Sequence, residues 1–199
     1  MIIGGGKMTL TGWVINTQSF IDDDYGYVNI ATTWKGKDMP SKPKQNEPIE
    51  VMWSNESLYG VIGSKVGDFI ETHGVNASLQ EGIFTHRSIA EQLVKTFSGL
   101  KINEIRWREN PLEHTLNNGK PRMKRAKWLP EKEVDIVYMY SDTYVDVCNP
   151  QLVHTDFFTA IRANEDYEHN WLMCTKQTKE KLEAMKFKNI RIVESTIHG

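Results

Sequence analysis

Apolar and polar residues alternate along several short stretches of this chain of 199 residues, a pattern typical of β-strands with one buried face. The first stretch contains Trp13, Val14 and Ile15. The acidic run at residues 22–24 is predicted to form the turn that joins the first strand to the second. The predicted strands are residues 13–15, 25–31, 49–53, 134–140 and 144–148, and the last two are expected to pair with each other.

A helical period replaces this alternation in two segments that resemble each other, residues 83–107 and 172–194. Each begins with a short apolar run, continues through a Thr-x-x-Ser/Thr pattern into a helical stretch, and ends on alternating isoleucines. The pattern predicts two copies of a strand–helix–strand unit, although an ordinary recurring unit would also produce it. In this alignment Thr85 and Ser88 correspond to Thr175 and Thr178, and Leu100, Ile102 and Ile105 correspond to Phe187, Ile190 and Ile192.

The first copy has clear helix signals. Thr85 is the predicted N-cap, because its hydroxyl can accept from the N–H groups of the first turn. Ile89, Leu93 and Phe97 recur four residues apart and give the helix one apolar face. Gly99 is predicted to end the helix, since glycine enters the left-handed region without a steric penalty.

Other helical stretches have weaker signals. The helix of the second copy is expected to bury Leu182 and Met185 and to expose its charged residues. Residues 61–73 form a further helix candidate that glycines interrupt. Asp156 is predicted to cap a short helix over residues 157–161, with its phenylalanines buried.

The order of these elements, strands first and strand–helix–strand units later, predicts an α+β fold. We expect a mixed, mainly antiparallel sheet with helices packed on it and two copies of the strand–helix–strand unit. The chain is predicted to form a single domain over residues 1–199, with a β-rich part at 9–60 and the repeat-containing part at 80–196. Prolines and polar residues predict exposed connectors at residues 35–48 and 108–132.

Composition and charge narrow the class of protein. Apolar residues make up 39% and charged residues 25% of the chain, which is ordinary for a globular protein. The formal net charge of −2 gives no overall case for binding nucleic acid or an anionic membrane. Two cysteines, Cys148 and Cys174, are too few for a disulfide framework. With no secretory signal pattern and no apolar run of about 20 residues, we expect a cytoplasmic protein that does not enter a membrane.

Charged clusters are the first candidates for chemistry. The basic residues between Lys120 and Lys127 could contact phosphates, but on a near-neutral chain we favour a solvated loop, so nucleic acid is not the expected partner. The acidic clusters lack the ligand spacing of a calcium loop, and we interpret them as turns that could also face a basic partner. Those acidic residues are Asp22, Asp23, Asp24, Glu165, Asp166 and Glu168.

Cysteines and histidines suggest a metal site or a nucleophile, but their spacing supports neither. The closest groupings are Cys148 with His154 and Asp156, and His169 with Cys174, and neither has the paired short spacings of a zinc site. Cys174 follows an apolar run and is interpreted as a core residue. We therefore identify no catalytic residue, no metal ligand and no cofactor, and an enzyme that uses Cys148, His154 and Asp156 stays an alternative hypothesis.

The two repeated segments resemble a bacterial immunity-protein family, the eleventh catalogued immunity class of polymorphic toxin systems. The first match consists of FTHRSIAEQL at residues 84–93 followed by GLKI at 99–102. The second match includes Met173-Cys174-Thr175, Glu180, Leu182, Phe187 and Ile190. The family has an acidic residue where His86-Arg87 and Lys176-Gln177 follow the threonine here.

The resemblance implies a cytosolic protein without catalytic residues that binds a cognate toxin and occludes the toxin's active site. If the toxin were a basic nuclease, carboxylates would take the place of phosphates at the interface. The two acidic turns, at residues 22–24 and 165–168, are the expected contacts with the toxin. A homodimer remains compatible with the sequence. The alternative function is a nucleic-acid-binding accessory protein that uses the basic loop from Lys120 to Lys127.

Overall fold

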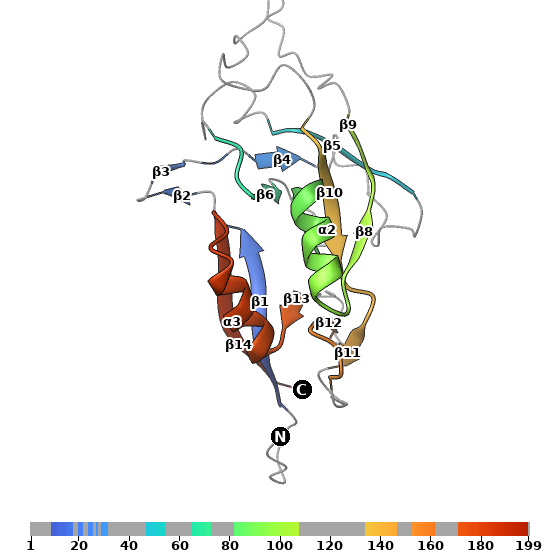
Figure 1. The fold of residues 1–199 in the computed structure, drawn as a ribbon, viewed down its shortest axis with the longest axis vertical. Coiled ribbons are helices and arrows are strands. Elements are labelled where there is room, and N and C mark those ends of the chain that lie inside the picture. The colour runs from blue at the N-terminus through green and yellow to red at the C-terminus, as the bar shows by residue number, and fades with distance from the viewer. Residues whose placement is uncertain are drawn as a thin grey trace, which may run out of the picture.

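The computed structural model describes part of the chain, and strands dominate that part (Figure 1). The predicted α+β class, with mixed and mainly antiparallel pairing, is confirmed. Helices are α2 (Arg87–Thr96) and α3 (Lys176–Ala184). The described residues are 9–17, 20–21, 24–25, 27, 29–31, 47–54, 65–72, 82–107, 134–146, 153–161 and 171–198.

The first sheet has the strand order β11-β12-β13-β1-β14. Strand β1 (Thr9–Thr17) lies between β13 (Trp171–Cys174) and β14 (Ile190–His198) and runs antiparallel to both. Strand β12 (Phe157–Ile161) pairs antiparallel with β13, and β11 (Tyr144–Asp146) pairs parallel with β12. The beginning and the end of the chain therefore share one sheet.

The second sheet has the order β8-β10-β7-β6-β4-β5-β9, and it returns on itself. Its end strands, β8 (Lys101–Asn103) and β9 (Ile105–Trp107), are two parts of one segment interrupted at Glu104. Strand β8 pairs with β10, whereas β9 pairs with β5, and the Ile49 N–H donates to the Glu104 carbonyl at 2.9 Å. The other strands are β4 (Asn29–Ala31), β5 (Ile49–Trp53), β6 (Phe69–Thr72), β7 (Gly82–His86) and β10 (Ile136–Tyr140).

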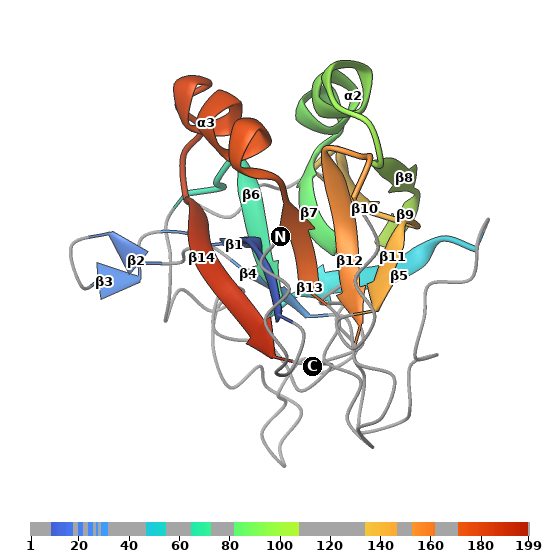
Figure 2. The same ribbon diagram turned by 90° about the horizontal axis from the view of Figure 1, so that it is seen from below.

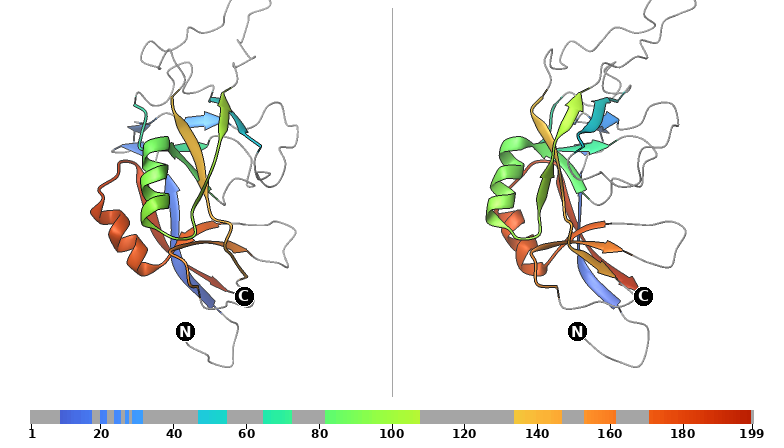
Figure 3. Two further views of the ribbon diagram at one scale, coloured as in Figure 1. Left: turned by 45° about the vertical axis from the view of Figure 1, so that its right-hand side comes forward. Right: turned by 90° about the vertical axis from the view of Figure 1, so that its right-hand side faces the viewer.

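Both helices lie on the same side of the strands (Figures 2 and 3). One apolar cluster takes Leu93 from α2, Leu182 from α3, Ile15 from the first sheet and Phe69 from the second. These side chains are at most 6% exposed, so their burial supplies a large apolar stabilisation shared by both sheets. A second cluster fills the curled second sheet, and a third lies on the first sheet around Phe158 and Met173.

Asn189 joins the two sheets by hydrogen bonds to one main-chain unit. Its Oδ1 accepts from the Phe69 N–H at 3.1 Å, and its Nδ2 donates to the Phe69 carbonyl. The side-chain amide thus takes the place of a neighbouring strand at the start of β6. Asn189 has φ 52°, a left-handed conformation that asparagine tolerates better than most residues. Gly67 makes room for it, because a Cβ there would clash with the Asn189 side-chain amide.

Two predicted helices are strands in the structure. Residues 69–72, within the helix predicted over 61–73, form β6, and residues 157–161 form β12. Phe157 and Phe158 are both buried but pack into different clusters, on opposite faces of the sheet. Side chains that point alternately to two buried faces are typical of a central strand, and they leave a continuous apolar run that periodicity cannot distinguish from a helix.

Three finer predictions were also wrong. Thr85 is not the N-cap of α2: its hydroxyl donates to the Asp68 carbonyl at 2.7 Å, and His86 precedes the helix without a side-chain cap. Strand β11 pairs with β12 and not with residues 134–140. The predicted strand over residues 25–31 is divided between β3 (Asp24–Tyr25), which pairs with β2 (Phe20–Ile21), and β4.

Several local predictions were confirmed. The helix predicted in the second segment is α3, and Thr175, which was not predicted as a cap, accepts from the Thr178 N–H at 3.3 Å through its hydroxyl. Gly99 follows the end of α2 with φ 83°. Both segments predicted as strand–helix–strand have that order of elements, β7-α2-β8 and β13-α3-β14. That the two are copies of one unit stays a prediction.

The contact between Asn189 and Phe69 leads to a stability prediction. Asn189→Ala should lower the free energy of unfolding by about 1–3 kcal/mol, because it leaves a partly buried N–H and C=O without partners. Asn189→Gly relieves the positive φ but not the lost hydrogen bonds, so it should recover only part of that loss. Urea unfolding measures both variants. Wild-type stability in Asn189→Gly would contradict the assigned role of the amide.

Candidate interaction site around Arg87

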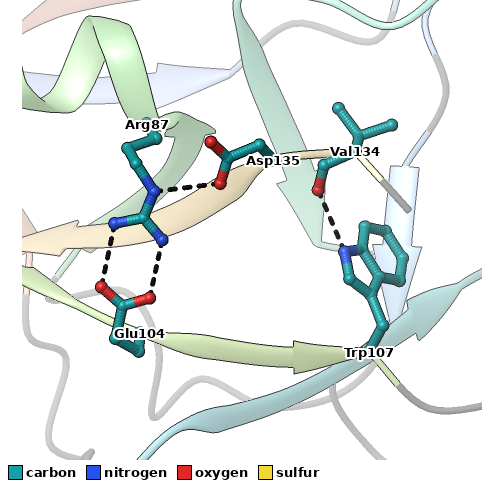
Figure 4. A network of polar contacts seen from close by, with 5 residues as sticks. All are labelled: Arg87, Glu104, Trp107, Val134 and Asp135. Carbon is teal, nitrogen blue, oxygen red and sulfur yellow. Dashed lines mark hydrogen bonds and ion pairs between the residues drawn. The ribbon is translucent and has the colours of Figure 1, made fainter. Parts of the chain in front are cut away.

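Arg87 is the first residue of α2, and its guanidinium holds two carboxylates (Figure 4). Nη1 and Nη2 donate to the two carboxylate oxygens of Glu104 at 2.9 and 2.7 Å, and Nε donates to Asp135 Oδ1 at 3.0 Å. A bidentate arginine–carboxylate pair fixes both partners in one plane and is stronger than a single contact. We refer to Arg87, Glu104 and Asp135 as the Arg87 triad.

The Arg87 triad links the start of α2 to two segments of the second sheet. Glu104 lies at the interruption between β8 and β9, and Asp135 immediately precedes β10. The Arg87 N–H also donates to the Asp135 carbonyl at 3.1 Å. Close by, Trp107 Nε1 donates to the Val134 carbonyl at 3.0 Å (Figure 4). These contacts hold the start of the helix against the region where the sheet returns on itself.

The carboxylates of the triad face solvent. The side chains of Glu104 and Asp135 are 58% and 71% exposed, whereas Arg87 is 33% exposed. The hydrogen bonds from Arg87 keep the pKa of Glu104 below its ordinary value, and the two carboxylates raise the pKa of Arg87. At neutral pH the triad carries one positive and two negative charges. It therefore presents a net negative, pre-oriented surface that a cationic group of a partner could contact.

The sequence contains only an indirect signal for this site. A basic residue in the first turn of a helix opposes the helix dipole, and α2 has no acidic residue in that turn to offset it. Two carboxylates from distant segments offset it instead, and they are 17 and 48 residues away along the chain. Residues so far apart cannot be paired from local patterns.

The structure says little about the acidic turns predicted as contacts. Asp24 belongs to β3, where it pairs with Ile21, and its side chain is not among those described. Asp22, Asp23, Glu165, Asp166 and Glu168 lie outside the described residues, and so does the basic loop from Lys120 to Lys127. The role of these residues as contacts therefore stays a prediction.

Asp156 has a structural role in the described part of the chain. Its carboxylate accepts from the N–H and hydroxyl of Ser98 at the end of α2, and from the Thr178 hydroxyl in the first turn of α3. Burial raises the pKa of Asp156, but these hydrogen bonds outweigh that effect and leave the pKa below its ordinary value. The carboxylate is thus an ionised connection between the two helices, with its oxygens occupied.

The remaining members of the Cys-His-Asp hypothesis do not form a described site. Cys148 lies outside the described residues, and His154 is exposed. Cys174 is fully buried, as predicted, and burial raises the pKa of its thiol to about 12. Such a thiol is protonated at neutral pH and cannot act as a nucleophile. Within the residues that the structure describes, no group of three or more His, Cys, Asp or Glu side chains could hold a metal ion.

A comparison of the chain with protein-family models, with curated proteins and with solved structures finds no match in any of the three. Among the described residues, no helix is both long enough and apolar enough to cross a membrane.

Arg87→Ala should destabilise the protein at neutral pH but not in acid. The pKa of Glu104 is lower in the folded protein than its ordinary value of 4.5. The ion pair with Arg87 therefore stabilises the fold above pH 4.5, and this stabilisation is lost as the pH falls through the lowered pKa. Because the triad is largely exposed, we expect a loss of about 0.5–1 kcal/mol at pH 7. Urea unfolding at pH 7 and pH 3 measures the difference.

The control for Arg87→Ala is Lys179→Ala, which breaks the i,i+4 pair with Glu183 within α3. That variant should change stability less than Arg87→Ala at pH 7, because its pair joins no separate elements. If Arg87→Ala cost the same at both pH values, the carboxylates would not be the source of its effect.

Cys174 should resist thiol reagents in the folded protein. At pH 8 a pKa of about 12 leaves a thiolate fraction on the order of one in ten thousand, and the sulfur is buried. In a Cys148→Ser variant, Ellman's reagent should therefore label Cys174 only after denaturant is added. Labelling at the same rate with and without denaturant would refute the assignment of Cys174 to the core.

Proposed function

We propose that this protein is an immunity protein that binds a cognate secreted toxin domain in the cytoplasm and neutralises it by covering the toxin's active site. Two observations support the proposal. The sequence resembles the immunity family at residues 84–102 and 173–190. The described surface also carries the Arg87 triad, a fixed acidic site at which a basic partner can dock.

The geometry of the triad is the observation that carries the proposal. Free carboxylates on a surface lose side-chain entropy when a partner orders them. In the triad, Arg87 already holds Glu104 through two hydrogen bonds and Asp135 through one, so less of this entropy remains to be lost on binding. Both carboxylates stay exposed and can accept hydrogen bonds from lysine or arginine side chains of the partner.

The chemistry of the triad suits a toxin with a basic active-site surface, such as a nuclease. Such a surface normally binds phosphates, and an acidic inhibitor offers carboxylates in their place. Opposite charges speed association and make it sensitive to salt. The same acidic surface would repel a nucleic acid, so the triad favours a protein partner over the nucleic-acid-binding alternative.

The triad predicts the effect of one charge reversal. Asp135→Lys should weaken binding to the toxin domain encoded beside the gene by about tenfold or more, since it places a cation where the partner is basic, and tenfold corresponds to about 1.4 kcal/mol. The fold should survive, because Glu104 keeps its bidentate contact with Arg87. Co-expression with growth rescue, size-exclusion chromatography and a binding titration at two salt concentrations measure the effect.

The matched control is Glu91→Lys, the same charge change at an exposed position of α2. Its affinity and rescue should stay close to wild type, and thermal unfolding checks that both variants are folded. Rescue by the wild-type protein without a stoichiometric complex would contradict neutralisation by binding. Equal affinities for Asp135→Lys and wild type would remove the triad from the interface.

A further inference from the structure

Five strands of each sheet follow the same order and direction. In the first sheet, β14-β1-β13-β12-β11 pair antiparallel at the first three steps and parallel at the last. In the second sheet, β8-β10-β7-β6-β4 pair antiparallel at the first three steps and parallel at the last. In each sheet the second strand in this order, β1 or β10, lies between two strands that are parallel to each other. A helix connects these two strands: α3 joins β13 to β14, and α2 joins β7 to β8.

The registers agree across the three central strands. The row Phe69–Thr85–Val137 in the second sheet corresponds to Phe157–Cys174–Trp13 in the first, and the next row Ile70–Phe84–Tyr138 corresponds to Phe158–Met173–Val14. The outer strands are then matched through their pairings with these strands. Thus Met139↔Ile102 corresponds to Ile15↔Ile192, Tyr138↔Asn103 to Val14↔Val193, and Ile30↔Thr72 to Val145↔Ala160.

The turns after the two helices share a phenylalanine and a residue with positive φ at the same spacing. Phe97 and Phe187 each lie two residues before a residue with positive φ, Gly99 and Asn189. Each phenylalanine makes an edge-to-face contact with the first residue of a strand in the other half of the chain. Phe97 contacts Phe157 at a centroid distance of 5.6 Å, and Phe187 contacts Phe69 at 5.5 Å.

Polar contacts repeat the same reciprocity. The carboxylate of Asp156 accepts from the Ser98 N–H at 2.9 Å, and the carboxylate of Asp68 accepts from the Lys188 N–H at 2.7 Å. Each aspartate precedes the strand that begins with the contacted phenylalanine, and each amide belongs to the residue after Phe97 or Phe187. Each contact from the first half to the second therefore has an equivalent contact from the second half to the first, as a twofold relation requires.

From these observations we propose that residues 9–107 and 134–198 are two copies of one folding unit, related by an approximate twofold axis, that exchange their first strands. Strand β1 opens the first copy but lies between β13 and β14 of the second. Strand β10 opens the second copy but lies between β7 and β8 of the first. The partner that each unit fits is another copy of itself, as in a domain-swapped dimer.

This correspondence differs from the alignment expected from the sequence. That alignment matches Leu100 with Phe187 and Ile102 with Ile190, whereas the ring contacts match Phe97 with Phe187 and the registers match Ile102 with Ile192. Thr85 corresponds to Cys174 and not to Thr175, because Thr85 and Cys174 are the middle residues of the two equivalent rows. Both alignments superpose apolar residues with a similar period, and only the strand pairing distinguishes the two alignments.

The two copies differ at the Arg87 triad. Counting from the common registers makes Glu194 the equivalent of Glu104 and Thr11 the equivalent of Asp135. Thr11 is a threonine whose hydroxyl lies 3.2 Å from that of Thr196, so the equivalent site has no carboxylate at the Asp135 position. The Arg87 triad itself combines Arg87 and Glu104 of the first copy with Asp135 of the second. The proposed exchange does not depend on the proposed function, and its tests use no toxin.

A cut between the copies tests the exchange. A protease recognition sequence with flanking glycine and serine residues is inserted between residues 108 and 133 of the full chain and is cleaved to completion under native conditions. Because each copy lacks its inserted strand without the other, the fragments should remain a one-to-one particle by native mass spectrometry and unfold in one thermal transition. Separation of the fragments in buffer, or two transitions, would overturn the proposal.

A matched pair of core substitutions in the intact chain tests the direction of the exchange. Ile15 in β1 and Met139 in β10 occupy equivalent places, and both are buried in the same cluster. Hydrogen–deuterium exchange of Ile15→Ala should rise most in β13 and β14, and that of Met139→Ala should rise most in β7 and β8. A rise confined to the half that contains the substitution would overturn reciprocal exchange.

Discussion

The insertion of β1 between β13 and β14 is the constraint on which the rest of the structure depends. Its register with β14 runs without interruption from Thr9↔His198 to Thr17↔Ile190, and on its other side it pairs with β13. Through Ile15, β1 also reaches the apolar cluster shared by both helices and both sheets. Closing such distant parts of a chain costs loop entropy, which only the combined burial and strand pairing can offset.

The contacts between the sheets have a common chemistry. Asn189 binds the main chain of Phe69, and Asp156 joins the ends of two helices. Each polar side chain satisfies backbone groups that the ends of helices or strands would otherwise leave unpaired. The Arg87 triad instead joins side chains at the surface and leaves its carboxylates open to solvent, and for this reason it is the part of the described surface to which we assign a partner.

The sequence predicted the elements whose patterns are local. Strand β5 was predicted because Ile49, Val51 and Trp53 recur at every second position, and Cys174 was assigned to the core from its apolar neighbours. Strands β6 and β12 were mistaken for helices because side chains on both of their faces are buried, which removes the alternation. The Arg87 triad depends on pairs 17 and 48 residues apart, and the fold that brings them together cannot be read from a single segment.

The central claim is that the chain is one cooperative unit because its halves complete each other's sheets. Differential scanning calorimetry of the wild-type protein tests it most directly. A single unit predicts one transition whose calorimetric enthalpy equals the van't Hoff enthalpy. Two resolved transitions, or a calorimetric enthalpy well above the van't Hoff value, would show that the halves unfold independently and would contradict the account.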